Sequence, residues 1–313
     1  MDRPRRPAAA LGLVAAWLLL AAVDASGFAD LRAARWMAAG ADPVRVLGTV
    51  EAECLRPVAG DEAYFVEVGR AAFRTPLLLG GQAARAGIAC ETCHQGGRRN
   101  PDFQFPGLSG APGTADVTTA LFSSHRDDGV DNPIPIPDLG GPKSRLRIPQ
   151  DQESLQRFIH GQITEEFNGA EPPPAVLRGL AAYVRAMGPE TCPAQERKAL
   201  HARDYADDAA RAVRAAMLAL ERKDTDTAIL MLQSARSRLG LIYERYDQSG
   251  GARSRAFLVT ADADLAAALG KVRVGDAAAG QALAVFLVRL GPGEKVLAAE
   301  EAGSLFDPAQ LKR

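Results

Sequence analysis

One five-residue motif, Cys90-Glu91-Thr92-Cys93-His94, constrains this chain more than any other feature of its sequence. Two thiols that are two residues apart can add to the two vinyl groups of one haem, and the imidazole that follows them can reach the iron. The motif therefore predicts one covalently attached haem c. We expect Cys90 and Cys93 to hold the haem and His94 to be the proximal iron ligand.

A C-x-x-C pair is also typical of two other sites, a half-site for zinc and a thioredoxin-like redox pair. A zinc site needs a second pair of Cys or His at ligand spacing, but the other cysteines, Cys54 and Cys192, stand alone in the sequence. A thioredoxin-like fold needs strands alternating with helices around Cys90, and no such pattern is present. Haem attachment is the interpretation that the sequence favours.

Residues 1–25 have the pattern of a secretory signal. A basic start is followed by an apolar run from Ala8 to Val23 and by the small-residue cleavage site Val23-Asp24-Ala25. We expect export to the periplasm, where c-type haem is attached and disulfides form. The alternative is a retained membrane anchor, although the run is shorter than the roughly 20 residues that span a bilayer. Membrane contact is expected only if the segment is retained.

Cys54 and Cys192 lie outside the haem motifs on either side. In an oxidising compartment we expect them to form a disulfide that links the beginning of the haem domain to its end. The bond would close a loop of roughly 140 residues, which stabilises by about 4 to 5 kcal/mol in the chain-entropy description. The alternative is two free thiols.

The composition is that of a globular chain without a basic footprint for nucleic acid. It has 313 residues, of which 24% are charged, and a net charge of −1. We therefore expect no nucleic-acid partner. Alanine is abundant, which favours helix.

The hydrophobic periodicity predicts a mainly α fold in two parts: a cytochrome c-like haem domain over 26–192 with a long Gly/Pro-rich loop, and a helical accessory domain over 193–313. In the first part helices are expected at Phe28–Ala39, Tyr64–Phe73, Gln152–Phe167 and 172–187. The helix Gln152–Phe167 is amphipathic, and its apolar face is expected to point inward: Leu155, Phe158, Ile159, Ile163 and Phe167.

Long Ala-, Leu- and Arg-rich helices are expected in the second part: about Gln195–Arg222, Thr227–Tyr246, Ala261–Lys271 and Ala277–Leu290. Asp224 and its neighbours predict an N-cap in a tight link, so the first two helices should form an antiparallel hairpin. His201 is expected to be solvated. We find no catalytic constellation in this part.

Between the motif and the next helix lies a loop, Gln95–Pro149, rich in Gly and Pro. A loop of this length carries function or packs on a large body such as haem. Its apolar residues are expected either to contact the haem edge or to pin the loop to the helices: Phe103, Phe105, Leu121, Ile134 and Ile136. Arg98 and Arg99 are expected to meet haem propionates or to be solvated on the surface.

Two stretches of sequence resemble those of a known family. Before the motif it is Val68–Leu77 with Gly87-Ile88-Ala89, and after the motif it is His125-Arg126-Asp127-Asp128-Gly129 with the helix Ser154–Phe167. Over about residues 64–188 the chain resembles the di-haem cytochrome c peroxidase family. It has one C-x-x-C-H motif where that family has two.

The resemblance also implies a sixth iron ligand. In that family a Met followed by Gly-x-Ile supplies it, and here His160-Gly161-Gln162-Ile163 occupies the pattern with His in place of Met. We expect His160 to bind the iron, with His125 and Met187 as the alternatives.

These observations predict an exported monohaem c-type cytochrome that transfers electrons between redox partners, either partner proteins or small electron carriers. The alternative is a peroxidase-like haem enzyme that reduces hydrogen peroxide, with Glu165, Glu166 or His125 above a vacated iron position. The sequence assigns no catalytic residue and leaves open whether the chain is an enzyme. A sixth ligand and the single haem motif favour electron transfer.

Overall fold

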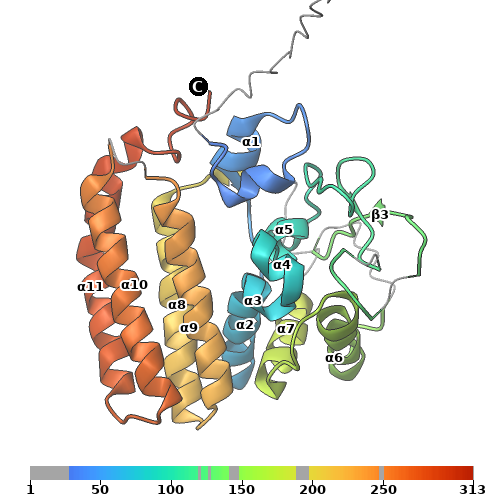
Figure 1. Ribbon diagram of the computed structural model, residues 1–313. Helices are drawn as coiled ribbons and strands as arrows, with labels where there is room; N and C mark the ends of the chain where they lie inside the picture. Colours follow the sequence, from blue (N-terminus) through green and yellow to red (C-terminus); the bar gives the residue numbers. More distant parts are fainter. Residues whose placement is uncertain are drawn as a thin grey trace, which may run out of the picture.

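The computed structural model describes residues 28–118, 121–125, 128–140, 148–187, 197–246 and 250–312. In this part the fold is mainly helical, as the sequence predicts (Figure 1). The expected signal, residues 1–25, lies outside the described residues. Among the described residues, no helix combines the length and the apolar character needed to cross a membrane.

The first part of the chain consists of short elements around two longer helices, α2 and α7. Its helical elements are η1 (Arg32–Trp36), α1 (Pro43–Gly48), α2 (Gly60–Phe73), α3 (Pro76–Leu79), α4 (Gly81–Ala86), α5 (Cys90–Cys93), η2 (Gln95–Gly97), α6 (Gln152–Gly161), η3 (Gln162–Glu166) and α7 (Pro174–Ala186). Its strands are β1 (Thr49–Glu51) and the antiparallel pair β2 (Thr114–Ala115) and β3 (Ile134–Pro135). The expected Gln152–Phe167 helix is therefore split, because its last turn, η3, is π-helical.

Helices α2 and α7 approach each other closely through two glycines. A Cβ atom at Gly69 would overlap the carbonyl group of Gly179, and a Cβ atom at Gly179 would lie 2.8 Å from the backbone nitrogen of Gly69. Only glycine at these positions lets the two backbones come so near. This crossing supports the motif helix α5 from one side, since Phe73 at the end of α2 lies beside His94, with ring centroids 6.3 Å apart.

Four long helices form a bundle next to the first part (Figure 1). They are α8 (Ala202–Glu221), α9 (Thr225–Tyr243), α10 (Ala252–Arg273) and α11 (Ala279–Glu300), followed by the short turn η5 (Glu301–Gly303). Helix α8 packs against α9, α2 and α11. Its buried face is mostly alanine, which allows neighbouring helices to come close: Ala202, Ala206, Ala209, Ala210, Ala212, Ala215, Ala216 and Ala219.

The tight link between α8 and α9 is confirmed. The Asp224 side chain accepts a hydrogen bond from the backbone N–H of Thr227 at 3.0 Å, which is an N-cap. The outer helices are longer than expected, because α10 begins at Ala252 and α11 continues past Pro292 to Glu300. A proline inside a helix costs about 3 kcal/mol. The buried side chains Leu290 and Leu297 on either side of Pro292 show that tertiary packing outweighs this cost.

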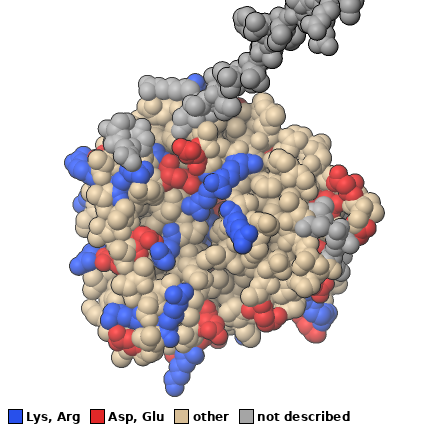
Figure 2. Space-filling view, in the orientation of Figure 1, with Lys and Arg blue, Asp and Glu red and all other residues tan. Residues whose placement is uncertain are grey.

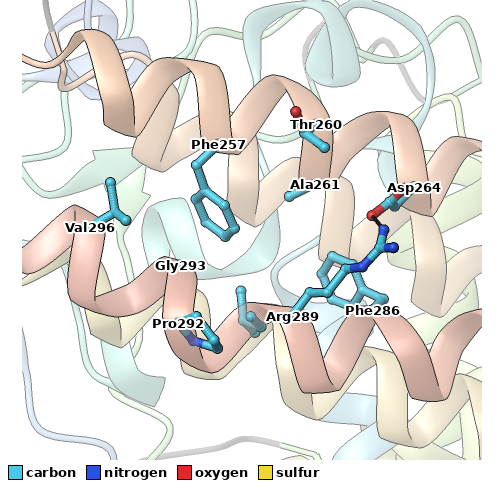
Figure 3. A pocket seen from close by; sticks show the side chains of 10 residues that line it. Phe257, Thr260, Ala261, Asp264, Phe286, Arg289, Pro292, Gly293 and Val296 are labelled. Atoms are coloured by element: carbon cyan, nitrogen blue, oxygen red, sulfur yellow. Dashed lines mark hydrogen bonds and ion pairs between the residues drawn. The ribbon is translucent and has the colours of Figure 1, made fainter.

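A pocket of about 300 Å³ lies between α10 and α11 (Figure 3). Gly293 lies against the ring of Phe257, and a Cβ atom at Gly293 would overlap that ring. The Arg289–Asp264 ion pair, with 2.9 Å between nitrogen and oxygen, also borders the pocket. The pocket is the space left where α10 and α11 lie apart between these contacts.

The expected helix start at Gln195 is wrong over the described residues. Arg197–Ala199 forms strand β4, which pairs antiparallel with β1. Strand pairing with a partner far away in the sequence overrides the local helical preference here. The bundle and the first part also share one continuous hydrophobic core, which extends from Tyr64 to Phe306. The division of the chain at residue 192 stays a prediction.

Cys54 takes part in a disulfide, as expected from an exported chain. Its predicted partner, Cys192, lies outside the described residues. The other two cysteines, Cys90 and Cys93, are free thiols. His201, the residue before α8, keeps 38% of its side chain exposed, and its Nδ1 lies 2.6 Å from the carboxylate of Glu301.

Candidate haem-attachment site

The C-x-x-C-H motif forms one helical turn whose ends are fixed by hydrogen bonds. The backbone N–H of Ala89 donates to the Thr92 hydroxyl at 3.0 Å, which caps the start of α5. After the turn, the Asn100 side chain donates to the Thr92 carbonyl, and its backbone N–H donates to the Cys93 carbonyl, both at 2.9 Å. The turn holds Cys90 and Cys93 on one side and places His94 at its end.

The surroundings of the two thiols in this turn favour their protonated form. Both are partly buried and pack against the hydrophobic core. Burial raises the pKa of Cys90 and of Cys93 to about 12. A redox-active C-x-x-C pair needs a lowered pKa, because the thiolate is the species that attacks. The environment therefore disfavours the thioredoxin-like interpretation.

The ring orientation of His94 is set by a backbone carbonyl. Its Nδ1 lies 3.1 Å from the carbonyl oxygen of Pro137. A carbonyl only accepts, so Nδ1 carries the proton and Nε2 keeps its lone pair. Among the described residues, no side chain or backbone group bonds Nε2. Burial lowers the pKa of His94 to about 4, which keeps the ring neutral at pH 7. A neutral imidazole with a free Nε2 and an orienting carbonyl is the usual form of a metal-binding histidine.

The segment that carries Pro137 is fastened to the turn after the motif. The backbone N–H of Leu139 donates to the Gly97 carbonyl at 3.0 Å. Arg98 forms an ion pair with Asp138, at 2.9 Å between Nε and Oδ2. Arg98 is thus buried and paired, so the expectation that it is solvated is wrong, whereas Arg99 is exposed. These contacts hold the Pro137 carbonyl in place against His94. Contact of either arginine with a haem propionate stays a prediction.

The apolar residues of the long loop divide into two groups. Phe103 and Ile136 are buried, 0% and 6% exposed, so they pin the loop to the core. Phe105 is partly buried and lies next to Phe122. Leu121 and Ile134 are 39% and 64% exposed, which leaves them available to a haem edge.

The three candidate sixth ligands lie in different environments. His160, in the last turn of α6, has its Nε2 2.8 Å from a carboxylate oxygen of Glu171. His125 is exposed, and its backbone N–H donates to the Ser123 hydroxyl at 3.0 Å. Met187 is buried, and a Cβ atom at Gly97 would overlap its sulfur.

The surroundings of Met187 and of His160 bear on whether either side chain could bind the iron. Met187 packs against Gly97, in the loop that directly follows His94. For His160 to bind iron, its contact with Glu171 must break. That contact is a solvent-exposed pair, with side chains 37% and 73% exposed, and such pairs are weak. His160 as the sixth ligand stays a prediction.

Phe158 on the same helix is 45% exposed, so the expectation that it faces inward is wrong.

Glu91, between the two cysteines, belongs to a buried charge network that the sequence did not reveal. One of its carboxylate oxygens lies 2.9 Å from Arg74 Nε, and the other accepts a hydrogen bond from Arg238 Nη2 at 2.9 Å. The side chains of Arg74 and Arg238 are each 4% exposed. Arg238 comes from α9, so the helical bundle directly contacts the C-x-x-C-H turn.

The network continues through two further carboxylates. Glu53 accepts from Arg70 at 2.8 Å and from Arg74 at 3.0 Å, and Asp208 of α8 pairs with Arg70 at 2.6 Å. Burial alone would raise the pKa of Glu53, but the guanidinium groups of Arg74 and Arg70 hold it well below its usual range. The spacing of Arg238, three residues after Ala235 and four before Ile242 on the buried face of α9, is the signal that could have identified it.

The donor set around the motif fits a haem c: two free thiols for two thioether bonds and one neutral imidazole with an unbonded Nε2. Within the described ranges, no group of three or more His, Cys, Asp or Glu is arranged to hold a metal ion. No protein-family model, no curated protein and no solved structure matches this chain.

Proposed function

We propose that the chain is an exported monohaem c-type cytochrome that passes single electrons between redox partners. The observation that carries the proposal is the hydrogen bond from His94 Nδ1 to the Pro137 carbonyl, next to the two free thiols of the same turn. It orients an imidazole for axial ligation at the one place where the chain could attach a haem.

Each residue of the site then has a physical role. Cys90 and Cys93 anchor the cofactor covalently, and His94 supplies the proximal nitrogen. The Pro137 carbonyl fixes the tautomer and the angle of the ring, and the Arg98–Asp138 ion pair fixes the segment that carries this carbonyl. Haem c, when bound, supplies a reversible one-electron couple.

The disulfide at Cys54 supports the proposed periplasmic location, since such bonds persist in oxidising compartments. His160 is the sixth ligand in this proposal, through the Nε2 that now contacts Glu171. A six-coordinate iron favours electron transfer over peroxide chemistry, which needs an open position and a nearby acid-base group.

The test starts from the haem-loaded, reduced protein. In stopped-flow measurements it is mixed either with a small oxidising partner, such as ferricyanide, or with hydrogen peroxide. We expect rapid oxidation by the partner and negligible peroxide turnover. Peroxide turnover with kcat above about 1 s⁻¹, in the usual range for enzymes, would replace the proposal with the peroxidase alternative.

A further inference from the structure

A groove of about 450 Å³ lies between the first part of the chain and the bundle, with arginines along it. Arg32 comes from η1, Arg85 from α4, Arg236 from α9 and Arg273 from the end of α10. In Figure 2, basic side chains gather on the face where α4 and α9 lie. The volume falls within the range of about 300–1,000 Å³ that is typical of ligand sites.

The positive charge of the groove is only partly neutralised. Arg32 pairs with Glu244 at 3.0 Å, and Arg236 pairs with Asp262 at 2.7 Å. Arg85 and Arg273 are exposed and make no hydrogen bond or ion pair with any described residue. Four guanidinium groups against two carboxylates leave an excess of two positive charges.

Uncharged groups of the groove complete a site for an organic anion. The side chains of Gln233 and Ser237 form part of its lining and have no hydrogen-bond partner among the described residues, so their donors are available. Pro76 and Leu77 add an apolar wall, and Leu77 is 57% exposed. An anion with a short carbon skeleton would satisfy the polar donors and cover the apolar wall together.

We propose that this groove binds a small organic anion that carries two or more carboxylate or phosphate groups. Guanidinium groups bind both kinds of oxyanion through paired N–H donors. Two unpaired arginines on different elements, α4 and α10, call for at least two negative charges on the ligand. The inference goes beyond the haem site, because none of these residues belongs to the motif and binding needs no haem.

The test is isothermal titration calorimetry on the full mature chain with two organic probes, citrate and fructose 1,6-bisphosphate. We expect saturable binding that weakens as the salt concentration rises, since exposed charges are screened. Tighter binding of citrate assigns the groove to a carboxylate ligand, and tighter binding of fructose 1,6-bisphosphate assigns it to a phosphate ligand. Both results support the proposal.

The variant Arg85→Gln with Arg273→Gln removes the two unpaired charges without breaking an ion pair of the described residues. It should weaken binding at least about tenfold, because hydrogen bonds to charged groups are lost. The matched control is Arg203→Gln with Lys295→Gln, which removes the same total charge from exposed positions outside the groove. The control should bind within about twofold of the wild type.

Three results would overturn the proposal. The first is that neither probe binds at low salt. The second is equal weakening in the control and the groove variant, which would mean that net charge and not the groove attracts the probe. The third is binding of poly-glutamate without binding of either probe, which would make the groove a docking surface for an acidic protein segment.

Discussion

Arg238 of α9 donates a hydrogen bond to Glu91, the residue between the two cysteines of the C-x-x-C-H turn, at 2.9 Å. The same guanidinium donates to the Arg74 carbonyl at 2.8 Å, and Arg74 lies against the other oxygen of Glu91. The bundle is therefore bonded to the C-x-x-C-H turn by a charge-assisted contact. The position of that turn depends on residues almost 150 positions later in the chain.

Replacing Arg238 should destabilise the protein strongly. Arg238→Met leaves Glu91 with one partner fewer in a buried site, and breaking a buried pair costs about 3 to 5 kcal/mol. Urea unfolding measures the loss. The double variant Arg238→Met with Glu91→Gln should recover part of it, because the uncharged amide at position 91 no longer lacks a cationic partner.

The matched control breaks an exposed pair. Arg157 contacts Glu153 one turn earlier on α6, with side chains 65% and 82% exposed. Arg157→Ala should cost no more than about 0.5 kcal/mol. Equal losses in the two arginine variants would contradict the importance of the buried network.

The glycine crossing of α2 and α7 makes a second prediction. Gly69→Ala inserts a methyl group into the carbonyl of Gly179, and overpacking of this kind costs about 1–3 kcal/mol or more. Gly270→Ala in α10 is the control, because a Cβ atom there meets no atom within 4 Å. It should stabilise by up to about 1 kcal/mol through helix propensity. Thermal unfolding of both variants tests the prediction. An unchanged melting temperature for Gly69→Ala would show that the two helices do not cross closely.

Much of the first part could be predicted from local signals. Helix α2 follows from its apolar spacing and from Pro76 beyond its end, and the start of α7 follows from the proline run before it. Strands β1 and β4 could not be predicted, because each has three residues and their pairing joins Thr49 to Ala199.

Within the candidate site, too, local sequence signals do not predict contacts between distant residues. The motif itself identifies Cys90, Cys93 and His94. The carbonyl that orients His94 belongs to Pro137, which is one of several prolines in an irregular loop, and nothing in the local sequence distinguishes it. The partners of Glu91 likewise depend on tertiary packing, since a carboxylate between two cysteines looks solvated until Arg74 and Arg238 are placed around it.

Acid should remove the stability that Glu53 provides. Although burial raises it, the pKa of Glu53 in the folded chain lies well below the ordinary value of 4.5, because Arg74 and Arg70 stabilise the carboxylate. A lowered folded-state pKa contributes stability that is present above the ordinary value and is lost as the pH falls below it.

The measurement is the free energy of unfolding in urea between about pH 7 and pH 3. The wild type should lose stability steeply below about pH 5, and Glu53→Gln should be less stable at pH 7 with a shallower slope. Parallel pH profiles for the two proteins would contradict the assignment.

In the haem-loaded protein, His160→Ala should convert the ferric iron from low spin to high spin. The loss of an axial nitrogen ligand is the physical reason, and optical and EPR spectra report it directly. His125→Ala and Met187→Leu are the matched controls and should leave the low-spin spectrum unchanged. If His125→Ala changes the spectrum and His160→Ala does not, the sixth ligand is His125.

The central claim is that one haem is bonded covalently to Cys90 and Cys93, and the intact mass of the denatured protein tests it most directly. The protein is produced with a c-type haem maturation system and extracted with acid-acetone before the measurement. The account predicts the mass of the chain plus one haem, and the bare chain for Cys90→Ser with Cys93→Ser. A bare-chain mass for the wild type, or covalent haem in the double variant, would contradict it.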